Sequence, residues 1–160
     1  MSSSESKLHF GSTGVGKSHI AQGLGQQACR LGYDVLFTKA VKLFRFVLAG
    51  RADHSWDKRI KKYLAPDLLI IDDFGLSSLS STQAEDFYEI VTGRHLKSSI
   101  VITSNRPPQD WVPLFPYPVM ANSALGRLAH HAHHLIMEGE SYQKKLSPKS
   151  SNLSLPKVGK

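Results

Sequence analysis

The sequence has a single cysteine, no long apolar run and fewer acidic than basic residues, and each shortage excludes a class of protein. Cys29 alone cannot form an internal disulfide, so a disulfide-stabilised scaffold is excluded. No run of about eighteen apolar residues occurs, which argues against a membrane span, and no apolar leader with a small-residue cleavage site is present. We therefore expect a cytoplasmic protein that does not enter a membrane.

The remaining composition is that of one globular domain with a basic surface. A hydrophobic fraction of 41% in 160 residues is enough for a single core. Lys and Arg number 20 against 13 Asp and Glu, which gives a net charge of +7. Such a balance favours polyanionic partners, nucleic acid first.

Residues 11–18 read G-S-T-G-V-G-K-S, the complete pattern G-x-x-x-x-G-K-[ST] of a phosphate-binding loop. Its glycines permit backbone conformations in which successive N–H groups point at the phosphates of a nucleotide. We expect Lys17 to reach the β and γ oxygens and Ser18 to hold Mg²⁺. The predicted cofactor-binding residues are Gly11, Ser12, Thr13, Gly14, Val15, Gly16, Lys17 and Ser18. A glycine-rich turn without a ligand is the alternative, and it is disfavoured because a strand precedes the loop and a helical pattern follows it.

Apolar runs and helical periodicities alternate along the chain, which predicts a parallel sheet covered by helices. Predicted strands are 7–10, 35–38, 68–71, 99–103 and 135–137, and predicted helices are 20–31, 43–48, 56–64, 82–95 and 123–132. Thr82 to Glu85 fits a capping box, and 107–118 is a Pro-rich loop with one turn around Trp111. The fold class is therefore α/β, an αβα sandwich with a mostly parallel central sheet. We expect one domain over 7–142, between a disordered end at 1–6 and a disordered basic tail at 143–160.

Two carboxylates follow the apolar run 68–71. Asp72 and Asp73 would stand at the carboxyl end of a buried strand, where open α/β sheets bind ligands. This pattern is a Walker B motif: Asp72 would complete the Mg²⁺ site opposite Ser18, and Asp73 would orient or activate the attacking water. A plain strand-end turn is the alternative, and the phosphate loop disfavours it.

Asn105 ends the next apolar strand, after Thr103 and Ser104. An asparagine at a strand end is usually a turn residue. If this strand lies between the phosphate loop and the carboxylates, its amide can position water beside the γ-phosphate. We therefore predict a catalytic role for Asn105.

Two further clusters have competing interpretations. The histidines are His130, His131, His133 and His134, and surface positions are favoured over a metal site because no carboxylate or cysteine completes a ligand set nearby. The basic residues are Lys39, Lys42, Arg45, Arg51, Lys58, Arg59, Lys61 and Lys62. They form either a solvated helix face or a surface for phosphate contacts with double-stranded DNA, without sequence preference.

Five segments resemble the IstB/DnaC-like ATPases of the AAA+ superfamily, and the resemblance spans about 10–144. The segments are 11–21 (G-S-T-G-V-G-K-S-H-I-A), 67–76 (D-L-L-I-I-D-D-F-G-L), 103–105 (T-S-N), 124–130 (A-L-G-R-L-A-H) and 139–142 (G-E-S-Y). The resemblance implies an AAA+ P-loop NTPase core that oligomerises on DNA, uses ATP and Mg²⁺, and works with a transposase or, in the DnaC branch, a replicative helicase. It also implies that Asn105 is the sensor I residue. Arg127 resembles the arginine finger, which reaches the nucleotide of a neighbouring subunit.

Members of this family carry a sizeable region before the phosphate loop, and we expect this chain to be an N-terminally shortened form. The function predicted is that of an ATP-binding AAA+ domain that helps a transposase in DNA transposition. The alternatives are a helicase-loader-like ATPase in DNA replication and a nucleotide-binding remnant without turnover. A small-molecule kinase is disfavoured, since no Arg-rich lid is visible.

Overall fold

The computed structural model describes residues 6–11, 16–130 and 132–137, and its centre is one five-stranded sheet. The strands are β1 (Ser6–Gly11), β2 (Val35–Lys39), β3 (Leu68–Phe74), β4 (Ser99–Ser104) and β5 (Ala132–Met137). Their order is β2-β3-β4-β1-β5, and all neighbouring pairs are parallel. The five predicted strands and their parallel arrangement are thus confirmed.

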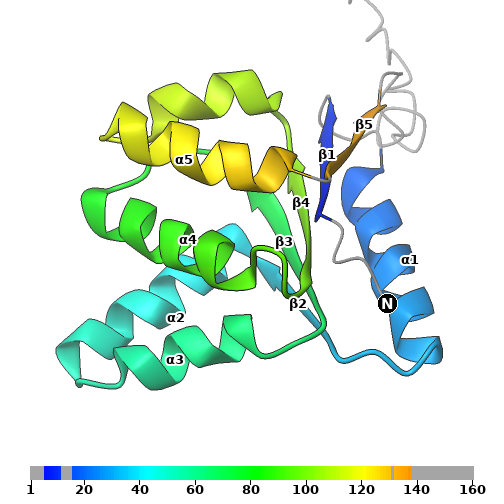
Figure 1. Cartoon of the computed structure of the whole chain (residues 1–160), viewed down its shortest axis with the longest axis horizontal. Helices are drawn as coiled ribbons and strands as arrows, with labels where there is room; N and C mark the ends of the chain where they lie inside the picture. The colour runs from blue at the N-terminus through cyan, green and yellow to red at the C-terminus, as the bar shows by residue number, and fades with distance from the viewer. Residues whose placement is uncertain (1–5, 12–15, 131, 138–160) are drawn as a thin grey trace, which may run out of the picture.

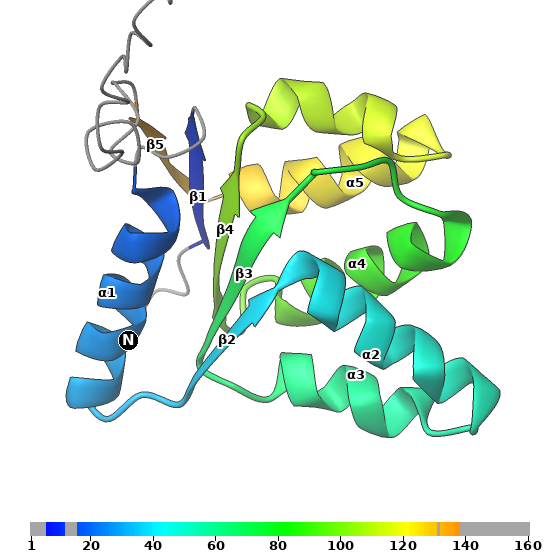
Figure 2. The same ribbon diagram turned by 180° about the vertical axis from the view of Figure 1, so that it is seen from behind.

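Helices cover the two faces of this sheet unequally (Figures 1 and 2). Helix α1 (Lys17–Arg30) lies on one face. The other face carries α2 (Ala40–Ala52), α3 (Trp56–Leu64), α4 (Ser81–Arg94), the 3-10 helix η1 (Pro108–Leu114) and α5 (Pro118–Ala129). The predicted αβα sandwich is confirmed.

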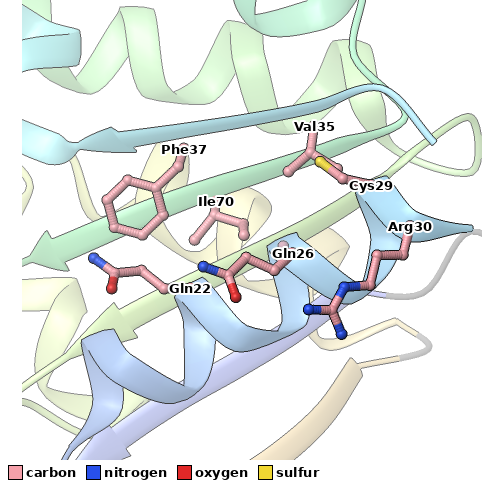
Figure 3. Close-up of a pocket in the computed structure, with 8 residues that line it drawn as sticks. Gln22, Gln26, Cys29, Arg30, Val35, Phe37 and Ile70 are labelled. Atoms are coloured by element: carbon pink, nitrogen blue, oxygen red, sulfur yellow. The ribbon is translucent and has the colours of Figure 1, made fainter. Parts of the chain in front are cut away.

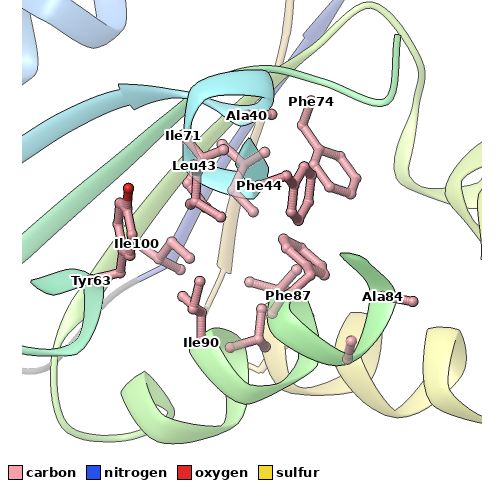
Figure 4. Close-up of a cluster of buried hydrophobic side chains, with 14 of the residues drawn as sticks. Ala40, Leu43, Phe44, Tyr63, Ile71, Phe74, Ala84, Phe87, Ile90 and Ile100 are labelled. Atoms are coloured by element: carbon pink, nitrogen blue, oxygen red, sulfur yellow. The ribbon is translucent and has the colours of Figure 1, made fainter. Parts of the chain in front are cut away.

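The main core lies between the sheet and helices α2 to α5 (Figure 4). Phe74 at the end of β3 stacks on Phe87 of α4 with a centroid distance of 4.6 Å, and its ring lies tilted against Trp111 of η1 at 4.7 Å. All three side chains are fully buried. This aromatic cluster fixes the end of β3, which is the strand that carries both aspartates.

A smaller apolar layer holds α1 against the sheet. Ala21 packs there with Ile70 and Val101, and all three are buried. Gly25 faces Ile70, and a Cβ at Gly25 would stand 2.9 Å from Ile70 Cδ1, closer than real contacts allow. The glycine therefore permits the close approach that brings the start of α1 to the edge of the sheet.

The start of α4 corrects one prediction. The capping box is not Thr82 to Glu85 but lies two residues earlier, at Ser80 and Gln83. Ser80 Oγ accepts from the Gln83 N–H at 3.1 Å, and Gln83 Oε1 accepts from the Ser80 N–H at 2.9 Å. Both sequences fit the pattern, since Gln serves as well as Glu at the third helical position.

The boundaries of several further elements also differ from the prediction. Helix α5 begins at Pro118 rather than at residue 123, because proline is tolerated at the first helical position, where its missing N–H is not needed. It ends at Ala129 rather than at residue 132, and Ala132 begins β5. Strand β3 runs three residues beyond Ile71, so the aspartates lie inside it rather than after it.

The predicted disordered segments 1–6 and 143–160 lie, apart from Ser6, outside the described residues, and stay predictions. Within the described part of the chain, none of the helices combines the length and the apolar character needed to cross a membrane.

Candidate functional site

The carboxyl edge of the sheet brings together the motifs found in the sequence. Strand β4 lies between β3 and β1, as predicted for the strand that leads to Asn105. Because all strands are parallel, β1, β3 and β4 end at the same edge, where open α/β sheets bind ligands. Helix α1 begins beside this edge (Figure 1).

The second half of the phosphate loop is formed by the start of α1. Gly16 is the N-cap of this helix with φ 91°, a left-handed conformation that glycine adopts without steric cost. Gly11 ends β1. Ser12, Thr13, Gly14 and Val15 lie outside the described residues, so their phosphate contacts stay predictions.

Lys17 is withdrawn from water at the first position of α1, with only 6% of its surface exposed. Burial lowers the pKa of Lys17 below its ordinary value of 10.5, because a desolvated ammonium is disfavoured. Asp73 and Asp72 act in the opposite direction through their negative charge. A buried ammonium between carboxylates suits the binding of a further anion such as a phosphate.

A hydrogen bond joins the two motifs directly. Ser18 Oγ donates to the Asp72 carboxylate, at 2.8 Å from Oδ1 and 3.0 Å from Oδ2. Asp72 is only 2% exposed, and the hydroxyl of Thr103 on β4 donates to the same Oδ1. Residues 54 positions apart thus present a hydroxyl and a carboxylate at one point, as predicted for the Mg²⁺ pair.

Asp73 has a different environment from Asp72. Its backbone takes φ 56°, its side chain is 35% exposed, and Lys39 Nζ at the end of β2 lies 3.4 Å from its Oδ2. The Asp72 carboxylate is therefore buried, whereas the Asp73 carboxylate is partly exposed and paired with Lys39. This division suits the two different roles predicted for the pair.

Asn105 and Arg127 lie in different places. Asn105 is exposed and follows the last residue of β4, so it stands at the carboxyl edge. Arg127 lies on α5, where it donates to Ser123 and stands 5.5 Å above the ring of Tyr88 on α4. Its contacts are therefore with the helical layer of its own chain, and the structure does not bring it into the site.

Sequence reasoning missed two side chains at this edge. The Thr103 hydroxyl contacts Asp72 and also accepts from the Asp73 N–H at 3.0 Å. Its place near the carboxyl end of the strand that leads to Asn105 was a signal, because open α/β sheets bind ligands at that edge. Lys39 was seen only as one of many basic residues.

The basic residues divide into two groups. Arg51 pairs with buried Asp86 at 2.6 Å, and Arg59 pairs with Asp53 at 2.9 Å while stacking over Phe46. These two arginines hold α2, α3 and α4 together. The second group is exposed and consists of Lys39, Lys42, Arg45, Lys58, Lys61 and Lys62. Of these, Lys39 contacts Asp73, and the Lys62 ammonium lies over the ring of Phe46.

The histidines give no sign of a metal centre within the described part of the chain. No group of three His, Cys, Asp or Glu side chains there converges closely enough to hold an ion. The ring of His130 lies 5.7 Å from that of His95. The structure does not describe His131. His133 and His134 lie in β5, for which only the backbone is described.

A groove of about 430 Å³ runs between α1 and strands β2 and β3 (Figure 3). Phe37 and Ile70 face Gln22 and Gln26 across it, and Cys29 lies at one end. The lone cysteine is exposed. None of Lys17, Ser18, Asp72 and Asp73 lines this groove, so it is separate from the carboxyl-edge site.

Solved structures of low sequence identity share this fold. The DnaC helicase loader matches with a TM-score of 0.71 and 23% identity, over 84% of this chain and 78% of that one. The replication initiator DnaA bound to AMPPCP and single-stranded DNA matches with a TM-score of 0.73 and 22% identity, over 85% and 41% of the two chains. The fold is that of AAA+ P-loop proteins.

Sequence relatives are closer. An ATP-binding protein in an insertion sequence of Mycobacterium tuberculosis is 40% identical over 145 residues, which is 90% of this chain and 58% of that protein. An insertion sequence IS21 ATP-binding protein of Pseudomonas aeruginosa is 32% identical over 151 residues, 94% of this chain and 57% of that protein. The chain thus spans a little over half the length of these relatives. The family model described as IstB-like ATP binding protein matches residues 3–150, and the chain belongs to this family.

Proposed function

We propose that the carboxyl edge binds ATP with Mg²⁺ and hydrolyses the ATP, as part of a helper protein in DNA transposition. The observation that carries the proposal is the Ser18 to Asp72 hydrogen bond, which joins the phosphate-loop helix to the end of β3. Mg²⁺ prefers oxygen ligands and keeps several waters. A hydroxyl and a carboxylate in contact at the sheet edge therefore fit the ion.

Each residue at this edge is assigned a different role in the proposed reaction. Lys17 would bind the phosphate oxygens together with the N-terminal partial charge of α1. Ser18 and Asp72 would hold the ion, which supplies positive charge against the phosphates when it is bound. Asp73 faces solvent and is assigned to orient the attacking water and accept its proton. Asn105, at the adjacent strand end, is assigned to hold the same water through its amide.

The transposition role is supported by the family relatives, whose names refer to insertion sequences. By analogy we propose that the protein acts with a transposase as a homo-oligomer on double-stranded DNA. Arg127 would reach the nucleotide of a neighbouring copy. Exposed Lys42, Arg45, Lys58 and Lys61 would contact DNA phosphates, so binding would weaken steeply with salt.

A helicase-loader role is the second candidate, favoured by the fold shared with the DnaC helicase loader. The relatives of higher identity favour transposition. Copurification of the chain with a transposase rather than with a replicative helicase would support the first candidate, and the opposite result would support the second.

The ATPase proposal is tested by hydrolysis and nucleotide binding, measured with and without double-stranded DNA. Lys17→Ala should lose both, whereas Asp73→Asn should bind ATP and lose turnover. Lys97→Ala and Asp57→Asn change exposed residues of the same type outside the site and serve as controls for nucleotide binding. ATP binding that does not depend on Lys17 would contradict the proposal. Binding without turnover in the unmodified chain would identify a remnant that only binds nucleotide.

A further inference from the structure

Strand β3 is irregular at the point where it presents its two aspartates. Ile71 pairs with Ile102, whereas Phe74 pairs with Ser104, so three steps along β3 match two steps along β4. One extra residue is therefore accommodated, and Asp73 takes φ 56°, which residues other than glycine adopt uncommonly. Such a bulge redirects side chains and leaves backbone groups without ladder partners.

The hydroxyl of Thr103 contacts both aspartates across this bulge. It accepts from the Asp73 N–H at 3.0 Å and donates its own hydrogen to Asp72 Oδ1. Thr103 is 1% exposed and Asp72 is 2% exposed, so these groups have little access to water as a substitute partner. One side chain thus replaces the missing ladder bond and orients the buried carboxylate.

Ser104 closes the other end of the irregularity. Its Oγ donates to the Phe74 carbonyl at 2.7 Å and accepts from the Arg106 N–H at 3.1 Å. Phe74 is in turn fixed in the aromatic core by its stacking on Phe87. The bulge is therefore held on one side by packing and on the other by the Thr103 hydroxyl.

We propose that Thr103 is the positioning residue of the site. Its hydroxyl holds the Asp72 carboxylate toward Ser18 and holds the Asp73 backbone in the conformation that turns its carboxylate to solvent. Thr103 acts through these aspartates and not on the nucleotide. The inference rests on the proposed function, because it assigns the two carboxylates to the ion and to the attacking water.

The direct test is hydrogen exchange of the Asp73 amide, measured by NMR in the protein without nucleotide. Thr103→Val keeps the shape of the side chain and removes its hydroxyl, so exchange at Asp73 should rise roughly tenfold relative to the Ile102 amide. Thr103→Ser should keep the wild-type rate. Thr92→Val makes the same change on α4, in the helical layer, and should also leave Asp73 unchanged. Thr103→Ala gives the same comparison if valine prevents folding.

The second readout separates positioning from a general loss of structure. Thr103→Val should lower kcat for ATP hydrolysis roughly 10- to 100-fold with KM within about threefold, since the carboxylates act mainly on the reaction step. Thr103→Ser should restore kcat to within about threefold of wild type by the same argument.

Three results would overturn the inference: an unchanged Asp73 exchange rate in Thr103→Val, no rescue by serine, or an equal kcat loss in Thr92→Val. If the wild-type protein shows no turnover, the hydrolysis proposal fails by itself. The exchange comparison then decides the role of Thr103 alone.

Discussion

Two cations in the described part of the chain are almost completely withdrawn from water, and they lie at opposite edges of the sheet. Lys17 begins α1 at the carboxyl edge and is 6% exposed, whereas Arg94 ends α4 at the amino edge and is 1% exposed. Both are costly to bury, because a desolvated charge needs partners. The difference between them lies in what those partners are.

Arg94 is surrounded by fixed backbone groups. Its guanidinium donates to the carbonyls of Tyr63 (2.9 Å), Leu64 (3.4 Å), Asp67 (3.3 Å) and Ser99 (2.6 Å). These carbonyls belong to the end of α3 and to the starts of β3 and β4, and the helix end in particular needs outside donors. Burial lowers the pKa of Arg94 to about 10, against the raising effect of Asp67, so the charge persists at neutral pH.

The surroundings of Lys17 are groups of the proposed nucleotide site. The carboxylates of Asp73 and Asp72 act on its charge, and the left-handed Gly16 precedes it. Burial alone therefore does not distinguish a site from a scaffold. A buried cation bonded to backbone carbonyls stabilises the fold, whereas a buried cation near carboxylates at a strand end suits ligand binding.

The largest effect is expected at Arg94. Arg94→Met leaves the carbonyls of α3, β3 and β4 without their donor, and should lower the free energy of unfolding by about 3 to 5 kcal/mol. Urea denaturation measures it. Arg30→Met makes the same change at an exposed position and should cost no more than about 0.5 kcal/mol. Equal stability of the two variants would show that buried Arg94 does not stabilise the fold.

The second largest effect is expected at Lys17, where ATP affinity rather than stability should change. Lys17→Ala should change the free energy of unfolding by less than about 1 kcal/mol, since it relieves a buried charge as well as removing contacts. It should weaken ATP binding roughly 100-fold, as expected for loss of a charged phosphate contact. Calorimetric titration and urea denaturation of the same sample check both. A large stability loss with normal ATP affinity would mean that Lys17 is structural like Arg94.

Buried carboxylates also divide into structural residues and residues of the proposed site. Asp86 is fully buried on α4, with Arg51 at 2.6 Å and the Trp56 indole Nε1 at 2.9 Å. Its partners are side chains of α2 and α3, so Asp86→Ala should cost about 2 kcal/mol of unfolding free energy and leave ATP affinity unchanged. Glu85→Ala is the matched control, because Glu85 is half exposed and lies 3.6 Å from the same Arg51. A loss of ATP affinity in Asp86→Ala would contradict the assignment of Asp86 to the fold alone.

The smallest effect is expected at the Lys39 to Asp73 contact, which is exposed on both sides. Exposed ion pairs contribute at most about 1 kcal/mol, so Lys39→Ala should raise kcat by no more than about fivefold as Asp73 becomes free to contact water. Lys97→Ala removes an exposed lysine just before β4, at the opposite edge of the sheet, and should leave kcat unchanged. Steady-state hydrolysis at low and high salt measures both variants. A fall in kcat would show that Lys39 assists the reaction.

The alternation of strands and helices and the meeting of the two motifs could be predicted from the sequence. Continuous apolar runs such as 68–71 indicate buried strands, and the bounds of α3 matched the prediction. The start of α4 could not be fixed, because two overlapping capping patterns occur. The choice depends on a distant contact, in which the Leu79 N–H donates to the Leu114 carbonyl at 2.8 Å and holds the chain just before Ser80.

The roles of Thr103 and Arg94 were also beyond the sequence, for one shared reason. Each depends on register or on the convergence of separate elements. The Thr103 hydroxyl matters because β3 gains a residue against β4, and no local pattern announces that bulge. Arg94, in the last turn of a helix, resembles an ordinary exposed basic residue until the end of α3 and the strand starts meet around it.

The central claim is that Ser18 and Asp72 form the ion-binding part of an ATP site. The most direct measurement is ATP affinity by calorimetry, with Mg²⁺ and with EDTA, for the wild-type chain and Asp72→Asn. Mg²⁺ should tighten ATP binding by the wild-type chain, and this gain should be lost in a folded Asp72→Asn variant. Absence of ATP binding by the wild-type chain, or a full Mg²⁺ gain in the variant, would contradict the claim.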